Sequence, residues 1–189
     1  MIFYNIPTSN DGGPMKNLEE FLRLSHYLKC YHLYQSFTEM DQRNRRAISR
    51  IESNLNGKEQ WTEEEQNELV QYHQVLEQVD FNNKLLENSF NNYDFDSDAV
   101  EQAMTDYKLY AYEWIIDTIQ ESLSTKVYSE HKDIINHVCA AEKVLRKHFI
   151  EKFYIIDDLD QIFEKAIFNL LEKALGWDID KIKEHFHIS

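Results

Sequence analysis

The feature that most constrains the fold is the scarcity of glycine and proline. The chain of 189 residues contains four glycines and two prolines. After residue 14 the sequence has no further proline, and its only glycines are Gly57 and Gly176. Sheet folds need many tight turns, and tight turns draw on these two residue types. The chain is therefore expected to form long helices joined by a few loops. We predict an all-α fold, an irregular bundle of five or six helices.

Apolar residues recur at three- and four-residue steps along most of the chain. The helices expected from this spacing cover about 16–37, 62–90, 98–123, 129–153, 158–175 and 178–186. The helical signal continues weakly through 38–55, which extends the first helix or forms a shorter one. A break at Asn56-Gly57 would fold this stretch back as an antiparallel pair with the helix over 62–90. Residues 1–15 are expected to form an irregular arm and 16–189 a single helical domain.

Two residues are expected to fix helix ends. Thr62 is followed three residues later by Glu65, the spacing of a capping box at a helix N-terminus. Gly176 follows the last apolar residue of its helix and suits the left-handed position after a helix C-terminus. In the helix that Thr62 opens, the apolar positions form a seam for packing against another helix, with Asn83 at one seam position.

The charge of the chain is strongly negative and unevenly distributed. The net charge is −14, and residues 57–125 carry sixteen acidic and three basic side chains. Such a segment repels nucleic-acid phosphates and attracts basic surfaces. We therefore expect a protein partner with a basic surface, such as a nucleic-acid-binding protein, and no direct contact of this segment with nucleic acid. The acidic residues expected to meet the partner are Glu63, Glu64, Glu68, Glu77, Asp80, Glu87, Asp94 and Asp96.

One acidic stretch carries a spacing that is associated with magnesium. Its acids are Glu64, Glu65, Glu68, Glu77 and Asp80. This spacing, EExxE followed by ExxD, resembles the paired-acid pattern of the all-α nucleotide pyrophosphatases over about seventeen residues. The resemblance implies a magnesium-dependent nucleotide hydrolase, in which the two acidic motifs lie on successive helices that converge. Here the intervening 69–76 contain no turn residue, and one continuous helix would separate Glu65 from Asp80 by about 22 Å.

A small basic cluster falls on one helical face, at Arg43, Arg46 and Arg50. It suits pairing with the acidic helix or with a second copy of the chain, so a homodimer is one expected assembly. Binding of phosphate or nucleic acid is the alternative for this cluster.

The aromatic content is high, with 11 Tyr, 11 Phe and 3 Trp. Tyr107, Tyr110 and Trp114 share one stripe of the helix over 98–123, where core packing is the default expectation. If these rings are exposed, they would anchor a partner. If they line a cavity, they would form the pocket of a ligand-sensing helical regulator.

Candidate metal ligands are few. His131, His137 and His148 lie on the helix over 129–153, and Asp133 precedes His137 by one helical turn. Histidines of different helices that meet in space are the remaining route to a metal site. We predict no catalytic residue, no bound metal and no cofactor.

The remaining features concern the cellular location of the protein. No apolar run approaches the roughly 20 residues of a membrane span, and the N-terminus lacks the pattern of a signal peptide. We expect a cytoplasmic protein, in a cell or an infected host cell, that does not bind membranes. Cys30 and Cys139 are expected to be reduced, packed thiols.

These observations favour a non-catalytic, acidic helical protein that binds a macromolecular partner. An inhibitor, immunity or anti-defence protein, whose negative surface occupies a basic groove on its target, is the most concrete form of this hypothesis. The nucleotide hydrolase and the ligand-sensing regulator are its alternatives.

Overall fold

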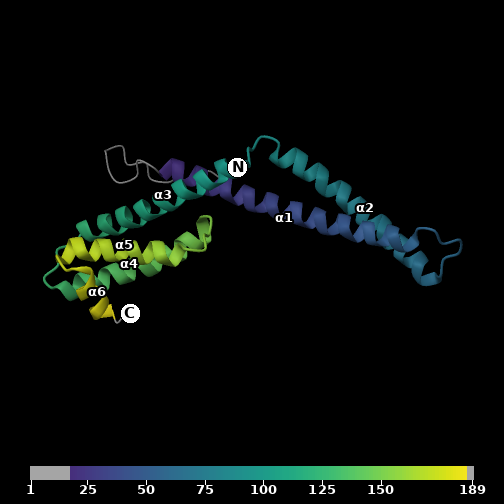
Figure 1. Cartoon of the computed structure of the whole chain (residues 1–189). Helices are drawn as coiled ribbons and strands as arrows, with labels where there is room; N and C mark the ends of the chain where they lie inside the picture. Colours follow the sequence, from purple (N-terminus) through teal and green to yellow (C-terminus); the bar gives the residue numbers. More distant parts are fainter. Residues whose placement is uncertain (1–17, 187–189) are drawn as a thin grey trace. The chain divides into compact units, whose positions relative to one another are not determined.

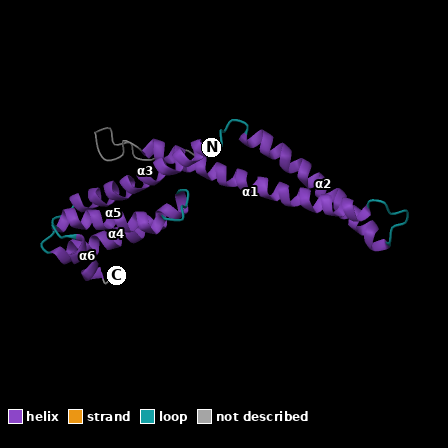
Figure 2. Ribbon diagram, in the orientation of Figure 1, coloured by secondary structure: helices purple, strands orange, loops and turns teal. Residues whose placement is uncertain are grey.

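The computed structural model describes residues 18–186, and in these residues it contains helices and no strands (Figures 1 and 2). The all-α prediction is confirmed. The six helices are α1 (Leu18–Leu55), α2 (Glu63–Phe90), α3 (Ser97–Ser124), α4 (His131–Lys152), α5 (Leu159–Leu175) and α6 (Ile179–Phe186). The predicted arm over 1–15 lies outside the described residues. None of the described helices combines the length and the apolarity needed to cross a membrane.

The contacts between Cα atoms group the chain into two compact units. Unit 1 consists of the described residues 18–28 and 101–186, and unit 2 consists of Lys29–Val100. Helices α1 and α3 each contribute residues to both units. The single domain expected over 16–189 stays a prediction.

Helix α1 continues without a break through 38–55, the stretch with the weak helical signal. Ile48 and Ile51 are buried there. Arg45 Nε donates a hydrogen bond to Asp41 Oδ2 at 2.7 Å, one turn earlier on the same helix. Pairs of this spacing add about 0.2–0.5 kcal/mol to a helix. Burial of two isoleucines and such local pairs therefore support a stretch that is polar on its other faces.

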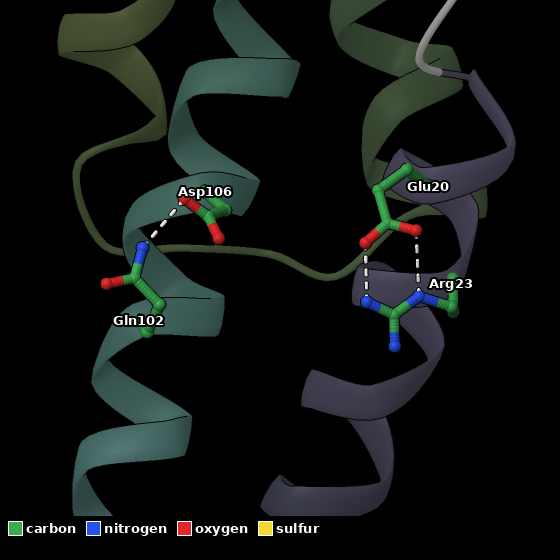
Figure 3. A network of polar contacts seen from close by, with 4 residues as sticks. All are labelled: Glu20, Arg23, Gln102 and Asp106. Carbon is green, nitrogen blue, oxygen red and sulfur yellow. Dashed lines mark hydrogen bonds and ion pairs between the residues drawn. The ribbon is translucent and has the colours of Figure 1, made fainter.

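Two further local pairs, on α1 and α3 of unit 1, join residues three and four positions apart on the same helix (Figure 3). Arg23 forms two hydrogen bonds with the Glu20 carboxylate, of which the one from Nε is 2.8 Å long. This bond holds the pKa of Glu20 below its usual value. On α3, Gln102 Nε2 donates to Asp106 Oδ1 at 2.9 Å. Both pairs are exposed, so they stabilise their own helices rather than contacts between helices.

The core of unit 1 is aliphatic and aromatic. The phenyl ring of Phe149 lies 5.2 Å from the Phe153 ring and 6.0 Å from the Phe163 ring, centroid to centroid. Burying one such side chain stabilises a fold by about 1.5–3 kcal/mol. The side chains with no measurable exposure are Leu28, Tyr107, Ala111, Ile115, Ile119, Val138, Phe149, Phe163, Ala166, Leu171 and Ile182.

Buried polar groups in this core are hydrogen-bonded across the chain. Tyr107 Oη donates to the backbone carbonyl of Tyr154 at 2.7 Å, and the Tyr154 N–H donates to Ser25 Oγ at 2.8 Å. Burial raises the pKa of the Tyr107 hydroxyl. The bonds join α1, α3 and the segment after α4, so they fix the relative positions of three elements of unit 1.

Helix α5 ends as the sequence predicts. Gly176 has φ of 65°, in the left-handed region, and its N–H donates to the Glu172 carbonyl at 2.9 Å. A side chain at this φ would be strained. The other helix ends lie one or two residues from the expected positions, apart from α1, which continues to Leu55.

Unit 2 is built on an antiparallel pair of helices, the later part of α1 and α2, as predicted. At the open end of the pair, away from the loop that joins α1 to α2, the Tyr34 and Phe90 rings lie 5.8 Å apart. Nearer that loop, at the tip of the pair, Tyr72 Oη donates to Glu52 Oε1 at 2.9 Å. As the position on α1 advances from Tyr34 to Glu52, its contact on α2 moves back from Phe90 to Tyr72. The two helices therefore remain in contact along their length.

Polar residues interrupt the seam of this hairpin. In the amide orientation that satisfies both neighbours, Asn83 donates to Asp41 Oδ1 at 3.3 Å and accepts from Arg45 at 2.9 Å. Asn82 is buried, and its Oδ1 accepts from Gln78 Nε2 at 3.0 Å. The Asn82 Nδ2 is buried with no hydrogen-bond partner. The seam position predicted for Asn83 thus holds a polar link between the helices, and its neighbour holds an unsatisfied amide.

An aromatic cluster closes the open end of the hairpin. Tyr93 and Phe95, in the loop before α3, stack at 5.4 Å with an interplanar angle of 10°. Phe95 lies 5.1 Å from the Tyr34 ring. A hydrogen bond with the Cys30 thiol raises the pKa of Tyr93. Cys30 and Cys139 are both thiols, as predicted. The cluster consists of Tyr31, Tyr34, Phe90, Tyr93 and Phe95.

Candidate partner-binding surface

Helix α2 opens with the predicted capping box. Thr62 Oγ1 accepts from the Glu65 N–H at 3.3 Å, and Glu65 Oε2 accepts from the Thr62 N–H at 2.9 Å. Lys58 forms an ion pair with the other carboxylate oxygen of Glu65. The bond from Lys58, and then that from the Thr62 backbone, hold the pKa of Glu65 below its usual value. Glu65 is therefore occupied at the helix end.

The five acids of the paired-acid pattern do not converge. Helix α2 is continuous from Glu63 to Phe90, so 69–76 are helical. The rise of a helix places Glu65 and Asp80 about 22 Å apart along the axis, whereas the ligands of one magnesium ion lie about 2.1 Å from it. The described residues also contain no cluster of three His, Cys, Asp or Glu able to hold a metal. The nucleotide hydrolase needs a break in this helix, and the helix has none.

The acids predicted to meet a partner lie on the surface of unit 2. Among them, Glu68 is half-buried, and the exposed ones are Glu63, Glu64, Glu77, Asp80, Glu87, Asp94 and Asp96. Glu77, Asp80 and Glu87 form no ion pair with any described residue. Asp94 Oδ1 accepts from the Asp96 N–H at 3.1 Å, a turn that also shapes the loop before α3. The carboxylates of Glu77, Asp80 and Glu87 are therefore exposed on α2 without an ion-pair partner among the described residues.

Two large apolar side chains stand among these acids. Phe81 is 61% exposed and Val70 is 57% exposed. They are eleven residues apart, about three turns, and so share the outer side of α2. Glu77 precedes Phe81 by one turn and Asp80 is adjacent to it in sequence. Phe81 was not among the predicted site residues, although its position two residues after the seam residue Val79 places it off the seam.

The basic cluster on α1 does not pair with the acids of α2. Arg43 Nη2 lies 3.6 Å from Glu39 Oε2, one turn away on the same helix. Arg46 and Arg50 are exposed and form no ion pair with any described residue. All three arginines lie off the side of α1 that carries the buried Ile48, and that side faces the seam.

The aromatic stripe on α3 belongs to the core of unit 1. Tyr107 is fully buried, and Tyr110 and Trp114 are half-buried. The Phe21 ring lies 5.0 Å from the Tyr107 ring and 6.1 Å from the Trp114 ring. The Phe153 ring lies 5.2 Å from Trp114. Other rings therefore pack against these side chains, and Tyr107 is not available as an exposed anchor.

No protein-family model, curated protein sequence or solved structure matches the chain. The role of the surface is therefore inferred from its own chemistry. The outer side of α2 offers unpaired carboxylates beside an exposed phenyl ring. This combination can attract a cationic surface and bury an apolar contact within it.

Proposed function

We propose that the chain is a non-catalytic binding protein whose α2 outer side docks on a basic surface of a macromolecular partner. The observation that carries the proposal is the exposure of Phe81, 61%, beside the unpaired carboxylates of Glu77 and Asp80. A phenyl ring at this exposure, on a helix with a separate packing seam, leaves most of its apolar area uncovered within the unit. We name Glu77, Asp80, Phe81 and Val70 the docking face.

The two kinds of side chain would act at different stages. Surface carboxylates raise the association rate with a cationic partner, and the effect falls as salt screens them. Buried aromatic residues near the centre of an interface carry much of the binding energy. We therefore assign the aromatic anchor to Phe81 on the acidic helix, in place of the anchor predicted at Tyr107, Tyr110 and Trp114.

The partner class follows from the charge. Residues 57–125 carry sixteen acidic and three basic side chains, so they repel phosphate and suit a groove that is itself built to hold phosphate. A nucleic-acid-binding protein offers such a groove. An inhibitor, immunity or anti-defence role, in which the hairpin occupies this groove, is the specific form that we favour.

A defined peptide pair tests the recognition chemistry. The probe is a fluorescent helical peptide with arginines around one leucine, and its twin carries glutamates in place of the arginines. The protein should bind the basic peptide and not the twin, and its affinity should fall as salt is raised. Affinity that does not change with salt would refute electrostatic docking.

Two variants separate the contributions of the docking face. Phe81→Ala should weaken binding by about tenfold, because an aromatic contact is lost, and should leave the salt dependence unchanged. Glu77→Gln with Asp80→Asn should reduce the salt dependence itself. The matched controls on unit 1 are Ile150→Ala, an exposed apolar residue, and Glu101→Gln with Glu121→Gln. Equal losses in the controls would show that binding does not use the docking face.

A second copy of the chain is a competing occupant. The exposed arginines Arg43, Arg46 and Arg50 could meet the α2 acids of another copy. Sedimentation equilibrium of the wild type and of Arg46→Gln with Arg50→Gln measures this. A dimer that the arginine variant abolishes would assign the acids to self-association instead of a foreign partner.

A further inference from the structure

A pocket of about 430 Å³ lies within unit 1, between the last two turns of α3 and the part of α4 from His137 to Leu145. None of its lining residues belongs to the docking face. Its apolar side is formed by Ala140, Ala141 and Val144 of α4, and its polar end by Ser122, His137 and Lys126. The pocket is open to solvent, since Lys126, Ala140 and Val144 are exposed, and its volume leaves room for a small molecule.

The polar end is organised by one short hydrogen bond. Ser122 Oγ and His137 Nε2 lie 2.6 Å apart, and both side chains are partly buried. The Tyr128 ring meets the His137 ring edge-on, with 5.7 Å between centroids and an interplanar angle of 72°. The imidazole is therefore held from two sides. Lys126, in the loop after α3, is exposed and forms no ion pair with any described residue.

The donor pattern of this pair depends on the ligand. When the imidazole carries its proton on Nε2, it donates to Ser122 Oγ, and the serine hydroxyl is released to donate to a third group. An anionic acceptor favours that arrangement, because it gains a charge-assisted bond from the hydroxyl. The Lys126 ammonium on the same pocket supplies one positive charge.

The opposite side of the pocket has uncovered apolar area. Val144 is 69% exposed although it lies in the middle of α4. Ala140 and Ala141 leave the space in front of it open, since their side chains are short. A hydrocarbon group placed there would remove apolar surface from water, at roughly 25 cal/mol per Å².

We propose that this pocket binds a small amphipathic carboxylate, with its carboxylate at Ser122 and Lys126 and its hydrocarbon part against Val144. One ammonium matches a single negative charge. The net charge of −14 disfavours ligands of higher negative charge.

The Ser122 and His137 pair lacks the other parts of a nucleophilic site. In the described chain no carboxylate bonds to the His137 imidazole to orient it. Ser122 also lies within helix α3, whose backbone N–H groups bond to its own carbonyls and leave no donors for an oxyanion. The geometry therefore assigns this pair to binding.

The test compares octanoate with octanol. Titration of each into the isotope-labelled full chain, followed by backbone and methyl NMR, should show octanoate shifting Val144, Ala140 and the Ser122 amide. Octanol should bind about tenfold or more weakly, because it lacks the charge-assisted bond. Failure of octanoate to shift these signals at millimolar concentration would overturn the proposal, as would equal binding of the two ligands.

Variants test whether Lys126 and Ser122, at the polar end of the pocket, bind the carboxylate. Lys126→Met should lower octanoate affinity by about tenfold and leave octanol affinity unchanged. The matched control is Lys132→Met, an exposed lysine of α4 that does not line the pocket. Ser122→Ala should act like Lys126→Met, and circular dichroism confirms that each variant is folded. Equal effects of Lys126→Met and Lys132→Met would overturn the assignment.

One further measurement distinguishes binding from catalysis. Hydrolysis of p-nitrophenyl octanoate that requires Ser122 would replace the binding role with a nucleophilic one and so overturn the proposal. Hydrolysis no faster than with Ser122→Ala supports it. None of these measurements involves the docking face, so they stand or fall independently of the basic-partner assays.

Discussion

The two units differ in how deeply they bury their side chains. Unit 1 contains eleven side chains with no measurable exposure, from Leu28 to Ile182. In unit 2 the most buried side chain is Asn82, at 1%, and its buried apolar residues are Ile48, Ile51, Val79 and Val100. A pair of helices covers only one side of each helix, whereas several helices packed together enclose a core.

This difference in burial indicates which positions of each unit tolerate substitution without loss of the fold. Substitutions in unit 1 remove close-packed volume, so its interior is constrained by packing. The hairpin depends on a narrow seam, one cap and a terminal aromatic cluster. Its outer side, with Phe81 and its neighbouring acids, is therefore available for recognition.

The largest expected effect tests the difference in depth directly. Phe149→Ala should lower the free energy of unfolding by about 3–5 kcal/mol, because it empties a fully enclosed site. Phe90→Ala, the same change in the half-buried cluster of unit 2, should cost about 1–2 kcal/mol, since less apolar area is lost. Urea unfolding monitored by circular dichroism measures both. Ile150→Ala, at the exposed neighbour of Phe149, is the control and should change stability by less than about 0.5 kcal/mol. Equal losses from Phe149→Ala and Phe90→Ala would contradict the difference between the units.

The next effect concerns the unsatisfied amide of the hairpin. Asn82→Leu should raise the stability of unit 2 by about 1–2 kcal/mol, because it removes a buried donor that has no partner and keeps the volume. Gln78 loses its acceptor, but it is exposed and can bond to water. Amide hydrogen exchange of α2 reports the change within the unit. Asn88→Leu places the same residue on the exposed side of α2 and should give no gain. Slower exchange in both variants would point to a general helix-propensity effect.

The cap of α2 should give a smaller effect. Thr62→Ala should destabilise the hairpin by about 1 kcal/mol, with faster exchange in the first turn of α2. Thr105→Ala, at a threonine that bonds its own helix on α3, is the control. Unchanged exchange in the first turn would show that the capping box is dispensable.

The same cap carries a pH dependence. The folded-state pKa of Glu65 is lowered, so its contribution is full above the ordinary value of 4.5 and is lost as pH falls through the lowered value. The stability difference between the wild type and Glu65→Gln should therefore disappear at strongly acidic pH. A difference that persists at that pH would assign the effect to packing instead of charge.

The smallest expected effect lies on α3 of unit 1. Burial, and then the charge of Glu113 one turn earlier, raise the pKa of Asp117. The folded chain therefore holds the proton more tightly, and stability falls as pH rises from 3.8 through the raised value. Asp117→Asn should add about 0.2–0.5 kcal/mol at pH 7 and nothing at pH 3. Thermal unfolding at the two pH values measures this, with Glu121→Gln as the exposed control; a gain of equal size at pH 3 would contradict it.

The sequence by itself determined the helical class, the cap at Thr62, the stop at Gly176 and the concentration of acids in 57–125. These features are local: capping, turn conformation and charge depend on neighbours along the chain. Periodicity also located the helices closely. It did not show that α1 continues through 38–55, because a polar stretch becomes helical when Ile48 and Ile51 find a partner helix.

Only the tertiary structure decided which side chains are exposed and which meet one another. It buried Tyr107 under Phe21, left Phe81 exposed, and brought Ser122 to His137 across the turn between α3 and α4. Helical periodicity tells which residues share a face, but the partner of that face depends on elements distant in the sequence. For that reason the sequence alone identified the acids as a candidate surface. The exposed Phe81 ring beside them and the pocket on unit 1 required the structure.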